Sequence, residues 1–320
     1  MRRQLAARLF KSLIVVLIVT TMSFFLIRLA PGDPFAYDGP NITPAIRAQW
    51  RAQYGYDRPV AEQFVRYLTS VGTGQLGYSH SQQRPVLEVL ATVIPRTLLL
   101  IGVSLAVSFA LGLVLGVVQA TRHGSWVDRA VSGVLLVFYS LPDFWFALVM
   151  LIAFTVWLPI FPTGGIVDPV MHEYMGPWTA FVDRIRHLVL PATTLVLLVS
   201  AVIARYQRTA LLDVLPAEFI RAARAKGASE QRVVWRHALR TSLTPVIALL
   251  GLLLPAIVGG SLFVETVFAW PGMGLTTADA IFKRDYDLVT ASVVVSSVMV
   301  AVGNLLADLL HAAVDPRVRE

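Results

Sequence analysis

The sequence predicts an all-α polytopic membrane protein with six transmembrane helices and with both termini in the cytoplasm. Of the 320 residues, 56% are hydrophobic and only 15% are charged, a balance too apolar for a water-soluble protein of this length. Uncharged runs of about 20 residues, the length that a bilayer core requires, recur along the chain. The basic residues are concentrated in alternate connecting segments, as expected when these segments share one side of the membrane.

The predicted spans cover residues 12–27, 97–121, 130–167, 188–204, 241–264 and 288–307. The third carries one charge, Asp143, and the fourth is short but is flanked by His187 and Arg205, whose side chains can reach the interfaces. The first span follows a basic segment and resembles a signal peptide. No small-residue cleavage site follows it, so we expect a retained membrane anchor.

Charge sets the predicted orientation. Residues 1–11, 122–129, 205–240 and 311–320 together hold 16 of the 27 Lys and Arg residues. Because Lys and Arg favour the cytoplasmic side of polytopic proteins, we place these segments in the cytoplasm. The excess of positive charge then reports orientation, and it indicates contact with a lipid bilayer and no nucleic acid.

This topology divides the chain into three regions. Residues 1–30 form the cytoplasmic N-terminus and the first helix, residues 31–95 an extracytoplasmic segment, and residues 96–320 a five-helix core that includes the cytoplasmic loop 205–240. The outer segment predicts two short amphipathic helices, at residues 43–55 and 58–71. They could form a lid on the outer helix ends or a docking site for another protein.

The loop contains a basic stretch, "PAEFIRAARAKGASEQRVVWRHALR", at residues 216–240. Pro216 suits the first turn of a helix, and Glu218 complements the positive end of the helix dipole. Lys226 fits the last turn, and Gly227 occupies the position where a left-handed residue ends a helix. These residues predict a short helix over 216–226 that ends in a glycine elbow.

A second helix is predicted to follow the elbow, with Ser229 as its N-cap and with Arg236, His237 and Arg240 near its C-terminal end. No obvious linker separates this helix from Thr241 and Pro245 at the start of the fifth span. The small side chains of Ala222 and Ala223 would allow another protein to approach closely, and Phe219 would supply an apolar contact. The pattern therefore favours a docking surface. An ordinary positively charged loop with some helicity is the alternative.

The segments "RAARAKG" and "RHALR", followed by Pro245, resemble the cytoplasmic EAA loop of ABC-importer permeases. Arg221, Ala222 and Ala223 stand at the E-A-A positions, and Gly227 is the glycine of the motif. Arginine in place of glutamate departs from the general consensus but agrees with the variant in the dipeptide and oligopeptide permease family. "RLAPGDP" at 28–34, "SLPDFW" at 140–145, "FPTGG" at 161–165 and "PGMG" at 271–274 extend the resemblance, in order, to the B-type subunit of that family.

The resemblance implies a type I ABC-importer permease fold, in a bacterial plasma (inner) membrane, with a cytoplasmic coupling (EAA) helix. It implies four kinds of partner: a second homologous permease of C type, one or two ABC ATPase subunits, an extracytoplasmic substrate-binding protein and the lipid bilayer. The implied cargo is a di- or oligopeptide, although similar permeases carry nickel complexes, glutathione or opines. The residues expected to contact the ATPase are Pro216, Glu218, Phe219, Arg221, Ala222, Ala223, Lys226, Gly227, Arg236 and His237.

No catalytic constellation is evident in the sequence. A phosphate-binding G-x-x-x-x-G-K-[ST] loop is missing, and neither a zincin helix nor a G-x-S-x-G motif occurs. We therefore expect a non-catalytic subunit that binds no metal or cofactor itself, with ATP and Mg²⁺ used by its partner subunits. An ion-driven secondary transporter is the alternative class, and an intramembrane enzyme is disfavoured.

Polar and helix-breaking residues inside spans indicate the translocation path or the interface between permeases, because lipid tolerates neither unpaired charge nor unsatisfied backbone. Asp143 could meet the amine of a peptide or pair with a cation of the second permease. The fifth span contributes the other candidates, which are Pro255, Gly259, Gly260 and Glu265.

Overall fold

The computed structural model describes residues 2–29, single positions between 43 and 55, and residues 57–314. Within these ranges, side chains are described from residue 8 to residue 309, except at 308 and at most positions between 251 and 260. The α-helices are α1 (Arg2–Leu29), α3 (Val60–Gly72), α4 (Val86–Thr121), α5 (Trp126–Ser140), α6 (Asp143–Leu151), α7 (Pro177–Val214), α8 (Glu218–Ala225), α9 (Glu230–Arg232), α10 (Leu239–Val267), α11 (Met273–Phe282) and α12 (Tyr286–Val314). The short elements are the antiparallel strands β1 (Tyr78–Ser79) and β2 (Arg84–Pro85), the π-helices η1 (Ile152–Trp157) and η3 (Val233–Ala238), and the 3-10 helix η2 (His172–Tyr174).

Four helices in the described part are long and apolar enough to cross a bilayer, and they lie in α1, α4, α7 and α12. A fifth candidate is the bent pair formed by α5 with α6 and η1. The predicted fifth span lies in α10, which is continuous over Leu239–Val267 although part of its side chains is outside the described residues. The structure thus has four or five apolar spans by this criterion, and the count of six stays a prediction.

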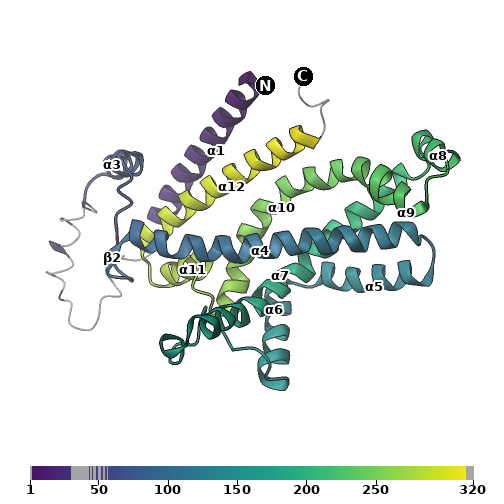
Figure 1. The fold of residues 1–320 in the computed structure, drawn as a ribbon. Helices are drawn as coiled ribbons and strands as arrows, with labels where there is room; N and C mark the ends of the chain where they lie inside the picture. The colour runs from purple at the N-terminus through teal and green to yellow at the C-terminus, as the bar shows by residue number, and fades with distance from the viewer. Residues whose placement is uncertain are drawn as a thin grey trace.

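The third predicted span, residues 130–167, is not one straight helix. Helix α5 ends at Ser140, α6 begins at Asp143, and the pair is bent by 104°. Leu141, the residue before Pro142, is extended (φ −82°, ψ 136°), as expected where the proline ring excludes the helical conformation of its predecessor. Helix α6 therefore runs in a different direction from α5 (Figure 1), and its Phe146, Ala147 and Met150 are buried in a cluster with side chains of α7 and α10.

Helices α4 and α7 form the centre of the bundle and run side by side (Figure 1). Their close approach depends on a G-x-x-x-G pair in α4, Gly112 and Gly116. A Cβ atom added to Gly112 would lie 2.6 Å from the Cβ of Ile203, and one added to Gly116 would lie 2.7 Å from the carbonyl oxygen of Ala204. Only glycine therefore allows this spacing between the two backbones.

Replacement of Gly116 by alanine is expected to lower the free energy of unfolding by about 1–3 kcal/mol, because the added methyl group overpacks the contact with α7. The measurement is the thermal unfolding midpoint of the purified protein in detergent. Gly102→Ala is the matched control, because a Cβ at Gly102 in the same helix meets no atom within 4 Å. Equal midpoints for both variants would show that the helices do not make this contact.

One end of the bundle carries α3 and the β1–β2 hairpin (Figure 1). Phe64 and Tyr67 of α3 contact the ring of Phe24 in α1, with ring centroids 5.3 and 5.2 Å apart, so this predicted helix packs on a span. Asp285, just before α12, accepts hydrogen bonds from the Ser79 hydroxyl (2.6 Å) and the Ser81 amide (2.9 Å). The predicted helix at 43–55 lies largely outside the described residues.

The predicted boundary at residues 95 and 96 falls inside a helix. Helix α4 begins at Val86 and includes Pro95, so the second span extends into the segment that was assigned to the outer side. Helices α1 and α12 lie side by side, and the end of α1 and the start of α12 both lie near α3 and the hairpin (Figure 1).

Candidate coupling surface

Helix α8 lies at the end of the bundle opposite to α3 and the hairpin (Figure 1). It spans Glu218–Ala225 with Ala217 as N-cap, so Pro216 precedes the helix and the predicted start at Pro216 is wrong. The extended backbone of Ala217 (ψ 150°) separates the proline from the first turn. The predicted acidic first turn is confirmed, because Glu218 is the first helical residue.

The elbow after α8 is confirmed. Lys226 is the C-cap residue, and Gly227 has a φ of +82°, in the left-handed region that favours glycine. The amides of Gly227 and Ala228 donate to the carbonyl oxygens of Arg224 (2.9 Å) and Ala223 (3.2 Å), which satisfies the last turn of α8. The elbow is thus a hydrogen-bonded turn with a defined geometry.

The helix after the elbow begins as predicted, with the hydroxyl of Ser229 accepting a hydrogen bond from the amide of Arg232. The predicted absence of a linker before the fifth span is confirmed. Arg236 and His237 belong to η3, and α9, η3 and α10 follow one another without a break from Glu230 to Val267. The π-helical turn of η3 widens the helix locally, just before the start of α10.

The inner face of this unit is anchored in a hydrophobic cluster. Ile220 of α8 is fully buried against Leu211 of α7, Val117 of α4 and Val233 of η3. Burial of one such side chain contributes roughly 1.5–3 kcal/mol. Displacement of α8 would therefore disturb the ends of α4 and α7 and the start of α10 together.

The face of α8 that points away from this cluster is exposed, and the guanidinium of Arg221 there lies 3.7 Å from the carboxylate of Glu218. Phe219 is 47% exposed, and Arg221, Ala222 and Lys226 are also exposed, whereas Ala223 is half-buried against the cluster. This face combines positive charge with one aromatic ring and a small side chain. It has the properties of a docking surface for another protein.

An ion pair bridges the elbow. The guanidinium of Arg224 donates to both carboxylate oxygens of Glu230, at 2.7 and 3.2 Å. This hydrogen bonding lowers the pKa of the Glu230 carboxyl and raises the pKa of Arg224. Because both side chains are exposed, the pair orients the two arms of the elbow more than it stabilises the fold.

The proposed path residues lie in α6 and α10, two helices that pack against each other. Asp143 is the first residue of α6, where its charge complements the helix dipole, and no basic side chain in the described part pairs with it. Pro255, Gly259 and Gly260 lie in α10, but the surroundings of these three residues are outside what the structure describes. Their roles in transport stay predictions.

Glu265 lies in a buried polar network within this chain. Its carboxylate is fully buried and accepts hydrogen bonds from the Thr97 hydroxyl (2.8 Å) and from the amides of Gly274 (2.6 Å) and Leu275 (3.2 Å). Thr97 in turn accepts from the amide of Met273 at 2.7 Å. The network joins α4, α10 and the start of α11, which is a role in folding that the sequence did not indicate.

Sequence reasoning missed other residues of structural importance. The G-x-x-x-G pair at Gly112 and Gly116 was visible as a motif. The hydrogen bond between Thr97 and Glu265 joins residues 168 positions apart, and no local sequence pattern predicts it.

Among the described residues no group of three or more His, Cys, Asp or Glu is arranged to hold a metal ion.

Comparison with known proteins identifies relatives over the whole chain. Residues 112–320 match the family described as binding-protein-dependent transport system inner membrane component, and residues 1–101 match its N-terminal family. The oligopeptide transport system permease protein AppB of Bacillus subtilis is 39% identical over 313 residues, 97% of each chain. The dipeptide transport system permease protein DppB of Escherichia coli is 34% identical and covers 94% of each chain.

The fold has a solved counterpart. A chain of the MetNI methionine ABC transporter, in an inward-facing conformation, superposes with a TM-score of 0.55 and 22% sequence identity. The alignment covers 71% of this chain and 96% of that chain. At this identity the comparison concerns the fold alone.

Proposed function

This chain belongs to the family of binding-protein-dependent transport system inner membrane components, and we propose that it forms half of the translocation pathway of an ATP-driven importer of di- or oligopeptides. It is a multi-pass membrane protein, and it is a permease subunit without catalytic activity of its own. The observation that carries the proposal is the rigid unit of α8, the Gly227 elbow and α9, which continues unbroken into α10.

In this proposal α8 is the coupling helix. An ATPase subunit would seat against the exposed face that contains Phe219, Arg221 and Ala222, and its movement would reach α10 through η3 because no flexible linker intervenes. ATP and Mg²⁺ would be bound by one or two ATPase subunits. A second, homologous permease would complete the pathway, and an extracytoplasmic binding protein would deliver the cargo, in a bacterial plasma membrane.

The peptide cargo is supported by the relatives, since AppB and DppB are named as oligopeptide and dipeptide permeases. The test is uptake of a labelled di- or oligopeptide by the complex reconstituted in liposomes with its binding protein. Uptake is expected to require ATP on the side of the liposome membrane that carries the ATPase subunits. It should persist when ion gradients across the membrane are collapsed. Uptake that is driven by an ion gradient without ATP would show a secondary transporter instead.

The proposal includes six spans with both termini in the cytoplasm. Single cysteines at Gln75, before the outer hairpin, and at Gln231, in α9, are then expected to react with a membrane-impermeant maleimide from opposite sides. Both positions are exposed, and the chain has no native cysteine that would give a background signal. Labelling from the same side would contradict the topology.

A further inference from the structure

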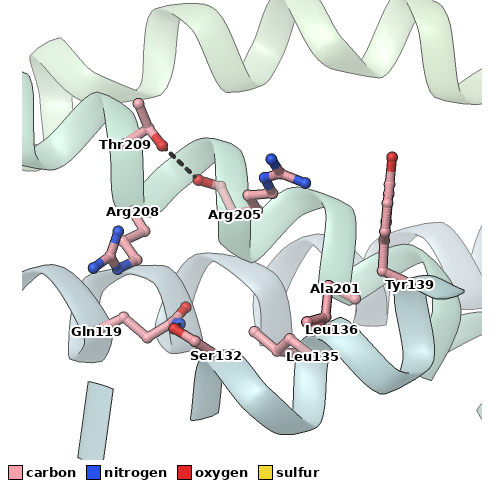
Figure 2. Close-up of a pocket in the computed structure, with 9 residues that line it drawn as sticks. All are labelled: Gln119, Ser132, Leu135, Leu136, Tyr139, Ala201, Arg205, Arg208 and Thr209. Carbon is pink, nitrogen blue, oxygen red and sulfur yellow. Dashed lines mark hydrogen bonds between the residues drawn. The ribbon is translucent and has the colours of Figure 1, made fainter. Parts of the chain in front are cut away.

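A pocket of about 460 Å³ lies among α4, α5 and α7, at the end of the bundle that carries α8 (Figures 1 and 2). Its lining combines two guanidinium groups, those of Arg205 and Arg208, with the polar side chains of Gln119 and Ser132. The coupling surface does not use these residues. The pocket therefore requires an explanation of its own.

The helices that line the pocket show how far it lies from the loop between α4 and α5. Gln119 lies two residues before the end of α4, and Arg208 binds Asp128 close to the short loop that connects α4 to α5. Arg205 lies one helical turn before Arg208 along α7, about 4.5 Å further from that loop. The polar headgroup layer of a bilayer is about 5–7 Å thick on each side. In the topology of the proposed function, with the α4–α5 loop at the cytoplasmic edge of this layer, Arg205 would lie near the boundary between headgroups and hydrocarbon.

The two arginines differ in their partners. Arg208 donates to both carboxylate oxygens of the buried Asp128, each at 2.9 Å, so its charge is compensated within the chain. Arg205 has no carboxylate partner among the described residues, and its guanidinium lies 5.7 Å from the centroid of the Tyr139 ring. Figure 2 shows Arg205 and Tyr139 extending to the same side. The pocket thus contains one cationic side chain, Arg205, whose charge no carboxylate of the described residues balances and which could bind an anion.

The floor of the pocket is polar and incomplete. The Gln119 side-chain amide donates to the Ser132 hydroxyl at 2.8 Å, and its carbonyl oxygen is buried without a hydrogen-bond partner in the described part. An unsatisfied buried acceptor costs about 1–3 kcal/mol. A ligand that carries a hydroxyl or ammonium donor beside its anionic group would match both features.

The rim is apolar on one side. Leu136 is 60% exposed and Tyr139 is 55% exposed, both on α5 next to the polar floor. Acyl chains could lie against these side chains while a phosphate meets Arg205. We propose that this pocket binds the headgroup of an anionic phospholipid of the inner leaflet, with Arg205 on the phosphate and Gln119 on a headgroup donor.

The test is the unfolding temperature of the full-length chain, purified with its co-purifying subunits and stripped of lipid, during titration with phosphatidylglycerol or with phosphatidylcholine of the same acyl chains. Phosphatidylglycerol is expected to raise the unfolding temperature of the wild type, and phosphatidylcholine is not. In Arg205→Gln the half-saturating phosphatidylglycerol concentration should rise at least about fivefold, which corresponds to about 1 kcal/mol for one basic side chain at the membrane surface. Arg205→Lys should retain most of the effect.

Two further variants keep the test decisive. Arg129→Gln removes an exposed cation of α5 outside the pocket and should leave the titration unchanged. Thr209→Glu adds a negative charge at an exposed position of the pocket and should weaken lipid binding even if Arg205→Gln folds poorly.

Three results would overturn the proposal. The first is equal stabilisation of the wild type and the pocket variants by phosphatidylglycerol. In the second, inorganic phosphate reproduces the stabilisation, which would indicate a soluble anion. In the third, a dipeptide with a free carboxylate stabilises through Arg205 and its amidated form does not, which would assign the pocket to the cargo.

Discussion

Gly227→Val is expected to abolish most ATP-driven uptake while leaving the chain inserted in the membrane. The backbone at Gly227 has a φ of +82°, and a Cβ atom there would meet nothing within 4 Å, so the substitution acts through backbone conformation alone. A non-glycine residue in the left-handed region costs about 1–2 kcal/mol, and a β-branched side chain is especially unfavourable. The elbow is then expected to reorganise and to misdirect α8 relative to α10.

The measurements are attachment of the ATPase subunits during purification, peptide-stimulated ATP hydrolysis and uptake. Gly124→Val is a matched control, because Gly124 has a φ of +76° with an equally open Cβ position, in the loop before α5. It should cost comparable stability without uncoupling hydrolysis from uptake. Ala222→Arg should also impair attachment, since it enlarges an exposed side chain on the docking face. Wild-type attachment and uptake in both Gly227→Val and Ala222→Arg would refute the role of α8.

Glu265→Leu is expected to cause the largest loss of stability. The substitution removes the acceptor for the Thr97 hydroxyl and for the amides of Gly274 and Leu275, in a place that water does not reach. Each buried donor left without a partner costs about 1–3 kcal/mol, so the total should be several kcal/mol. Uptake should fall with the amount of folded protein, because the contact between α4, α10 and α11 is lost.

The measurement is the unfolding temperature in detergent together with the yield of folded chain. Glu265→Gln keeps the size and one acceptor oxygen, so it should lose less stability than the leucine variant. Glu173→Leu serves as the control, because Glu173 is an exposed glutamate in η2. If the Glu265→Leu variant had wild-type stability but altered uptake, the result would support a role of Glu265 in the translocation path instead.

Local signals accounted for much of the fold. The apolar runs located α1, α4, α7 and α12, because a bilayer imposes a length and a composition on any helix that crosses it. Gly227 and Ser229 predicted the elbow and the start of the next helix, because a left-handed glycine and a capping hydroxyl act within a few residues. These features need no information from distant parts of the chain.

Other features depended on the conformation of the whole chain. Pro142 permitted a helix boundary, but hydropathy could not distinguish a straight span from one bent by 104°, since both have the same apolar composition. The run of helix from Ser229 into α10 was predicted, but the π-helical turn over Val233–Ala238, whose side chains pack in the cluster with α4 and α7, was not.

By itself the sequence determined a multi-pass helical membrane protein, the position of the elbow at Gly227 and the family of the chain. The tertiary structure alone decided that Glu265 holds α4, α10 and α11 together and that Gln119, Ser132 and Arg205 meet in one pocket. The physical reason is the distance along the chain over which each interaction acts. Hydropathy and capping are set by neighbours along the chain, whereas a buried hydrogen bond or a pocket requires side chains that folding brings together from separate helices.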